Sequence, residues 1–213
     1  MEYTEDQKKA LLTLDKNLQV IACAGSGKTQ IISQRVINIL KKKKVEPSKI
    51  IAFTYTEKAA AELKARILKL CREQIPEQKG LAEMYVGTIH AWCMKVLRDY
   101  KYEFQKFSVL DEIKLKLFVD RHFKEIGMKH LNMERYKDTG HFIQLVGMVR
   151  ESDFAPGVDV PEDIKLALTA YEKKLMKHCY LDFTMIMTKT LDFIQNDKEF
   201  RERLINNVGY LIV

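Results

Sequence analysis

Residues 18–29 read L-Q-V-I-A-C-A-G-S-G-K-T, an apolar run followed by a loop of small residues that ends in Gly-Lys-Thr. The run at residues 18–23 is typical of a buried strand, and residues 27–43 are typical of the helix that would follow it. Gly25 and Gly27 allow the loop backbone to turn so that successive N–H groups point inward at an anion. The stretch therefore predicts a strand, an anion-binding loop and a helix whose positive N-terminal end faces the same anion.

The loop matches the pattern G-x-x-x-x-G-K-[ST] with one departure, because Ala22 stands where the first glycine is usual. Loops with this pattern, called P-loops, hold the phosphates of a nucleoside triphosphate. Lys28 would add a positive charge for the outer phosphates, and Thr29 would offer its hydroxyl to Mg²⁺ as a metal ligand. A chance Gly-Ser-Gly-Lys-Thr loop is the alternative, and the expected strand and helix on either side argue against it. The predicted phosphate-binding residues are Ala24, Gly25, Ser26, Gly27, Lys28 and Thr29.

The composition is that of a globular protein with excess positive charge. The chain has 213 residues, enough for one large domain or two small ones, and 46% of them are hydrophobic. A net charge of +7 favours an anionic partner, nucleic acid first, although ordinary solubilising charge explains it equally well. The four cysteines are widely spaced without a C-x-x-C pair, which indicates reduced thiols in the cytoplasm. The acidic N-terminus is unlike a signal peptide, and no apolar run reaches the length of a membrane span. We therefore expect a cytoplasmic protein without a membrane partner.

Strand and helix patterns alternate in the first half of the chain. We expect strands at residues 18–23, 49–55 and 84–87, and helices at residues 4–14, 27–43, 57–74 and 89–100. Thr4 and Gln7 at the start of the first helix fit a capping box. Such alternation predicts a parallel, doubly wound α/β sheet with crossover helices.

The pattern changes after residue 107, and we expect no strand between residues 108 and 177. Helices are expected at residues 111–126, 141–151 and 161–178, with a loop at 154–160, and then at 181–196 and 197–206. The chain closes with an apolar strand at residues 210–213. A P-loop ATPase needs a carboxylate at the end of a neighbouring strand to hold Mg²⁺, and none follows this strand. We therefore expect the sequence to be a fragment cut at that boundary.

Four blocks of the sequence resemble, in order, the N-terminal part of UvrD/Rep/PcrA-type superfamily 1 DNA helicases. They are T-E-D-Q at 4–7, like the family's Q motif, and A-C-A-G-S-G-K-T at 22–29, like A-G-A-G-S-G-K-T. The third, A-F-T-Y-T-E-K-A-A-A-E-L-K-A-R at 52–66, is like T-F-T-N-K-A-A-x-E-M-x-x-R and is the most specific. The fourth, G-T-I-H-A-W at 87–92, is like G-T-F-H-S. Leu181-Asp182-Phe183 also resembles L-D-F-D-D-L, with Thr184 and Met185 in place of the two acids. The resemblance covers essentially the whole chain, and the family's D-E-x-Q-D would come directly after Val213.

This resemblance implies a RecA-like P-loop NTPase sheet with an inserted all-helical subdomain. The ATPase domain would comprise residues 1–107 and 178–213, and the insertion residues 108–177. The implied activity is that of an ATP-dependent DNA helicase that moves 3′ to 5′ on single-stranded DNA. Its cofactors would be ATP and Mg²⁺, with Lys28 and Thr29 as the catalytic residues.

The resemblance also implies further nucleotide contacts. Gln7 would read the adenine edge, for which the capping box is the alternative role. Arg66 would lie near the nucleotide, although a solvated helix charge explains it equally well. Gln30 takes the place of the family's arginine after the P-loop threonine, so one contact that stacks on adenine is in doubt.

DNA contacts are expected where the second and third strands end, because ligands of open α/β sheets lie at the carboxyl edge. The candidates are Phe53, Thr54, Thr56, Thr88 and His90. Without the family, Phe53 would be assigned to the core and His90 to a structural role, and Trp92 is assigned to packing. The expected partners are single-stranded DNA or single/double-strand junctions, and a second RecA-like domain that supplies arginine fingers. The alternatives are a nucleotide- or DNA-binding module without catalysis and a small-molecule P-loop phosphotransferase. We expect the fragment alone to be nearly inactive.

Overall fold

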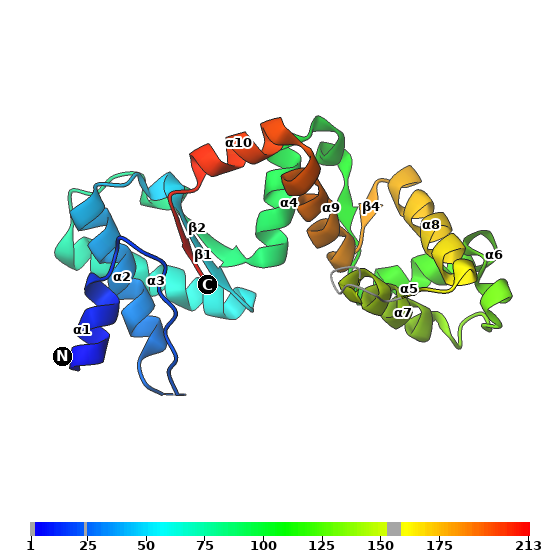
Figure 1. The fold of residues 1–213 in the computed structure, drawn as a ribbon, viewed down its shortest axis with the longest axis horizontal. Coiled ribbons are helices and arrows are strands. Elements are labelled where there is room, and N and C mark those ends of the chain that lie inside the picture. The colour runs from blue at the N-terminus through cyan, green and yellow to red at the C-terminus, as the bar shows by residue number, and fades with distance from the viewer. Residues whose placement is uncertain (1–2, 24, 153–158) are drawn as a thin grey trace. The chain divides into compact units, whose positions relative to one another are not determined.

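The computed structural model describes residues 3–23, 25–152 and 159–213. The chain divides into two compact units, Met1–Trp92 with Lys198–Val213, and Cys93–Asp197. These are called unit 1 and unit 2 (Figure 1). The sequence pattern predicted boundaries at 107/108 and 177/178, where the all-helical pattern was expected to begin and end. Along the chain, the two units instead divide at 92/93 and 197/198. The division into a RecA-like domain and a helical insertion remains a prediction.

Unit 1 is built on a parallel three-stranded sheet with the order β2-β1-β5. The strands are β1 (Ile50–Thr54), β2 (Tyr85–Thr88) and β5 (Tyr210–Ile212). In the register, Thr54 lies opposite Thr88, and Ala52 lies opposite Ile212. The carboxyl ends of β1 and β2 therefore meet at one edge, as the alternating pattern predicted. We call this edge, with the residues that directly follow the two strands, the carboxyl edge.

The helices of unit 1 lie before β1 and between the strands along the chain. They are α1 (Glu5–Leu12), α2 (Lys28–Lys43), α3 (Glu57–Gln74), α10 (Lys198–Asn207) and the start of α4 (Ile89–Tyr100), with 3₁₀ turns η1 (Pro47–Lys49) and η2 (Leu81–Glu83). Helices α2 and α3 pack against each other beside the sheet (Figure 1). Ile37 on α2, Ile50 on β1 and Ile67 on α3 are fully buried in one core, and the burial of each side chain contributes about 1.5–3 kcal/mol.

The strand expected at residues 18–23 is absent from the structure, and that prediction is wrong. Val20 and Ile21 are exposed, Ile21 by 91%. The apolar run satisfies the composition of a buried parallel strand, but such a strand also needs a neighbour with which to pair. Among the described residues the sheet has the order β2-β1-β5, and none of its ladders includes this segment.

Unit 2 is mainly helical. Its helices are α5 (Glu112–Arg121), α6 (Phe123–Ile126), α7 (Thr139–Ser152), α8 (Glu162–Lys177) and α9 (Phe183–Asn196), with 3₁₀ turns η3 (Tyr102–Lys106) and η4 (Met128–Leu131). The single helix expected at 111–126 is interrupted at His122, where the backbone leaves helical geometry. Most of the loop expected at 154–160 lies outside the described residues. In the described part of the chain, no helix combines the length and apolar character needed to cross a membrane.

A pair of short strands corrects the expectation that residues 108–177 contain no strand, because one member of the pair lies in that region. β3 (Ser108–Val109) and β4 (Tyr180–Leu181) form a parallel pair, with Val109 opposite Leu181. Each has two residues, too few to show an alternating pattern, and the partners are far apart in sequence. The mostly helical character of the segment is confirmed, but it begins at a strand pair.

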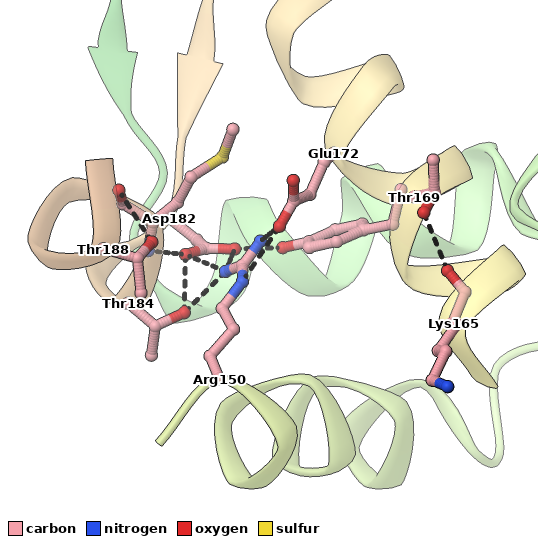
Figure 2. A network of polar contacts seen from close by, with 9 residues as sticks. Arg150, Lys165, Thr169, Glu172, Asp182, Thr184 and Thr188 are labelled. Atoms are coloured by element: carbon pink, nitrogen blue, oxygen red, sulfur yellow. Dashed lines mark hydrogen bonds and ion pairs between the residues drawn. The ribbon is translucent and has the colours of Figure 1, made fainter. Parts of the chain in front are cut away.

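A buried ionic network joins three helices of unit 2 (Figure 2). One guanidinium nitrogen of Arg150 on α7 donates to both carboxylate oxygens of Asp182, each at 2.8 Å, and to the Thr184 hydroxyl at 2.6 Å. Another nitrogen donates to Glu172 on α8 at 3.0 Å. The Tyr171 hydroxyl donates to Asp182 at 2.6 Å. The Arg150 and Asp182 side chains are only 3% and 5% exposed. Because water hardly reaches these charges, the hydrogen bonds from and to their protein neighbours must replace it.

Asp182 also begins α9, because its side chain accepts from the Met185 backbone N–H at 2.7 Å. Burial alone raises the pKa of Asp182, but the Arg150 charge and the donated hydrogen bonds outweigh it and lower the pKa below its ordinary value. Burial and the neighbouring carboxylate raise the pKa of Tyr171. The acid that the L-D-F resemblance singled out is thus an ionised helix cap inside unit 2.

Candidate nucleotide and nucleic-acid site

The loop before α2 has the backbone that the glycines predicted. Gly25 and Gly27 have φ angles of 77° and 84°, in the left-handed region that L side chains rarely adopt. Helix α2 starts at Lys28, directly after Gly27, so its first N–H groups face the loop. A side chain at either glycine would strain this turn. Ala24 lies outside the described residues.

Lys28 already lies over this loop. Its Nζ donates to the carbonyl oxygens of Ala22 at 3.1 Å and of Cys23 at 2.7 Å. The Ser26 hydroxyl donates to the same Cys23 carbonyl at 2.7 Å. Thr29 is exposed in the first turn of the helix. An ammonium, a hydroxyl and a helix N-terminus gathered at one open loop fit the phosphates of a nucleotide and a bound Mg²⁺.

Gln7 connects α1 to this loop. Its side-chain oxygen accepts from the Thr4 backbone N–H at 3.0 Å, and the Thr4 hydroxyl accepts from the Gln7 N–H at 3.3 Å, which completes the capping box. The side-chain nitrogen of Gln7 donates to the Ser26 carbonyl at 3.3 Å. The structural role weighed for Gln7 is therefore present, and the same side chain also lies beside the phosphate loop.

Two other predicted nucleotide contacts lie on helices of unit 1. Gln30 on α2 donates to the hydroxyl of Tyr3, which precedes α1, at 3.4 Å, so its amide already has a partner within unit 1. Arg66 is exposed on α3 and makes no hydrogen bond or ion pair with the part of the chain that the structure describes. The structure does not bring Arg66 into contact with the loop.

Hydroxyl groups gather at the carboxyl edge of the sheet. Thr54 and Thr88 lie in register at the ends of β1 and β2. The Thr54 hydroxyl donates to the Thr56 carbonyl at 3.1 Å, and the Thr56 hydroxyl caps α3 by accepting from the Ala59 N–H at 3.1 Å. The Thr88 hydroxyl accepts from the Ala91 N–H at 3.3 Å. Three of the predicted DNA-contact residues thus lie together where a ligand of an open sheet is expected.

Aromatic residues at this edge divide into packed and exposed rings. Phe53 is half-buried and packs edge-to-face against Tyr85 and Trp92, with centroid distances of 6.2 and 5.4 Å. Trp92 therefore has the packing role expected of it. His90, in the first turn of α4, is half-buried. Tyr55 lies one residue beyond β1 and is 96% exposed.

The loop, the helix that begins at Lys28 and the parallel sheet define a P-loop NTPase fold. The comparison with protein families then shows which kind. The chain belongs to the UvrD/REP helicase N-terminal domain family, whose model matches residues 3–213.

Curated relatives agree with this assignment. A probable DNA helicase of Mycoplasma pneumoniae is 28% identical across 100% of this chain and 41% of its own length. A probable DNA helicase II homolog of Mycoplasma capricolum is 26% identical across 98% of this chain and 30% of its length. The ATP-dependent DNA helicase PcrA of Leuconostoc citreum is 26% identical across 97% of this chain and 28% of its length. The chain thus spans between about a quarter and two fifths of these relatives.

Tyr55 is the residue that the sequence reasoning missed. The third block was read with Phe53 as the aromatic of T-F-T-N-K-A-A. Reading the same pattern backwards without gaps from Lys58-Ala59-Ala60 puts Tyr55, not Phe53, at its aromatic position. The signal was therefore present in the spacing, and the exposure of the two rings gives the same answer.

Proposed function

We propose that this chain is the N-terminal ATP- and DNA-binding part of an ATP-dependent DNA helicase that moves 3′ to 5′ on single-stranded DNA. The observation that carries the proposal is Lys28 at the start of α2, directly after two glycines in the left-handed conformation. Membership of the UvrD/REP family supports helicase activity as the purpose of that loop. The cytoplasm is the compartment we propose, in keeping with four cysteines that form no disulfide.

For the nucleotide, we assign Lys28 to the β- and γ-phosphates of ATP and Thr29 to Mg²⁺. Gln7 is assigned to the adenine, which its position beside Ser26 supports. Its two internal hydrogen bonds use one lone pair of the amide oxygen and one N–H of the amide nitrogen, which leaves a second lone pair and a second N–H for the adenine edge. Bound Mg²⁺ would supply positive charge to the phosphates, while the chain's own lysine and helix N-terminus hold them in place.

For DNA, we assign the carboxyl edge. Tyr55 presents a whole aromatic ring to solvent, and each base that stacks on such a ring contributes about 1–3 kcal/mol. The DNA backbone is offered hydroxyl groups by Thr54, Thr56 and Thr88. His90 follows Thr88 by two residues in the fourth block. Phe53 is assigned to packing at this edge, through its ring contacts with Tyr85 and Trp92.

The whole reaction requires more than this chain. In the proposed enzyme, a second RecA-like domain supplies arginine fingers, which contribute about 10³–10⁵ in rate when they act in trans. We therefore expect the 213-residue chain to bind nucleotide but to hydrolyse it near background and to leave duplex DNA unwound. An isolated chain of this kind would behave as a nucleotide- and DNA-binding module. For the 213 residues alone, the helicase proposal and the binding-module alternative therefore predict the same behaviour.

The test is a pair of titrations with the purified chain. A fluorescent ATP analogue with Mg²⁺ should bind the wild type, and Lys28→Ala should lose that binding. A fluorescent oligothymidine should bind more tightly than a duplex of equal length. Phosphate transfer to a small-molecule acceptor, together with no preference for single-stranded DNA, would contradict the proposal and favour a metabolic phosphotransferase.

A further inference from the structure

The carboxyl edge of unit 1 holds an acidic side chain at the place where DNA is proposed to bind. Glu57, the first residue of α3, accepts a hydrogen bond from the Thr88 hydroxyl, with 3.0 Å between the two oxygens. The side chain of Glu57 is exposed. The contact joins the start of α3 to the end of β2, and its carboxylate lies beside the register pair of Thr54 and Thr88.

The Thr88 hydroxyl has one proton to donate. Its oxygen already accepts from the Ala91 backbone N–H, so the direction of the proton is restricted and points to Glu57. A phosphate oxygen of a DNA backbone would need the same proton. The carboxylate and a phosphate would also repel each other, because both are negatively charged.

We propose that Glu57 is an internal competitor for the DNA backbone, an anion that holds Thr88 until a phosphate displaces it. This inference rests on the proposed function, since it names the residue that limits affinity at the same DNA-binding edge. As a consequence, single-stranded DNA binds the carboxyl edge more weakly than it would if only the hydroxyl groups and Tyr55 were present there. Removal of the charge should strengthen DNA binding.

An ordinary role for Glu57 must be separated from this one. An acid in the first turn of a helix stabilises that helix through its dipole. That role predicts a lower melting temperature after the charge is removed, and no gain in DNA affinity. Glu57→Gln preserves the shape of the side chain and can still accept from Thr88, so it tests the charge alone.

The matched control is Glu62→Gln, which removes the same charge from an exposed residue further along α3. The experiment measures fluorescence anisotropy of labelled oligothymidine with wild type and both variants, at several salt concentrations. Glu57→Gln should lower the dissociation constant about fivefold at low salt, the value of a like-charge contact near 4 Å in water. The gain should become smaller as salt is added, because ions screen the repulsion between the Glu57 carboxylate and a phosphate. Glu62→Gln should change the dissociation constant less.

Equal affinity of wild type and Glu57→Gln, or an equal gain in both variants, would overturn the inference while leaving the proposed function intact. If none of the three proteins binds the oligonucleotide, the proposed function fails and the inference fails with it. The two failures are therefore distinguishable in one data set.

Discussion

Replacing Asp182 by Asn tests the buried network of unit 2 most directly. The change keeps the shape of the side chain and removes its charge, which leaves the Arg150 guanidinium buried at 3% exposure. Removing one partner of a buried ion pair costs about 3–5 kcal/mol. Glu172 remains as a second partner for Arg150, but its side chain is 35% exposed and is partly screened by water. We therefore expect a loss near the lower end, about 3 kcal/mol.

The assay is urea unfolding followed by circular dichroism, together with hydrogen exchange measured on peptides from α7, α8 and α9. Exchange should accelerate in these helices, because the Asp182 side chain both pairs with Arg150 and caps α9. Glu172→Gln is the matched control and should cost about 1 kcal/mol or less. A loss below about 1 kcal/mol in the Asp182→Asn variant, or exchange unchanged in α9, would refute the reasoning.

Three further predictions concern other sites. Lys28→Ala should weaken binding of an ATP analogue by at least about tenfold, the equivalent of one charge-assisted hydrogen bond, without lowering the melting temperature of the nucleotide-free chain. Tyr55→Ala should weaken oligothymidine binding, measured by anisotropy, by about 1–3 kcal/mol without changing the melting temperature. Phe53→Ala should instead lower the melting temperature. The reverse pattern would contradict the assignment of Tyr55 to DNA and Phe53 to packing. Hydrogen bonds from Lys174 and His122 lower the pKa of Glu125 from 4.5 to about 2. Its pairing therefore stabilises the fold above pH 4.5, and this stability is lost as the pH falls towards 2. Urea midpoints should fall more steeply across that range in wild type than in Glu125→Gln.

The sheet of unit 1 could be predicted because its information is local. Residues 49–55 and 84–87 are short apolar runs that each precede a helix, and parallel pairing follows from that order. The final run at 210–213 was also expected as a strand, and β5 pairs with β1. The run at 18–23 has the same composition but is unpaired. Composition shows that a segment can be a strand, and only the neighbouring strands determine whether it is one.

The buried network could not be predicted, because its members are distant in sequence. Arg150 and Asp182 come from different helices, and the pairing depends on how α7 and α9 pack. The sequence did single out Asp182 through the L-D-F resemblance, but it gave no sign that the residue was a buried cap. Similarly, the two-residue strands β3 and β4 carry no periodic signal and form only because the tertiary fold brings them together.

The candidate site was predictable in outline and not in detail. The glycine spacing predicted the left-handed turns at Gly25 and Gly27, because few other residues allow them. Residue type alone favoured neither Phe53 nor Tyr55, since both are aromatic and only two positions apart, although the ungapped spacing to Lys58-Ala59-Ala60 points to Tyr55. Exposure distinguishes them, and exposure depends on the rings of Tyr85 and Trp92 that cover Phe53.

The hydrogen bonds of Lys28 to the carbonyls of Ala22 and Cys23 have a consequence for conformational populations. A nucleotide can use all three donors of the ammonium only in those molecules where it has left its own loop. For binding that needs all three, the apparent dissociation constant is the intrinsic one divided by the fraction of such molecules. If about one molecule in ten is competent at any moment, affinity falls about tenfold. Both acceptors belong to the backbone, so no side-chain truncation removes them.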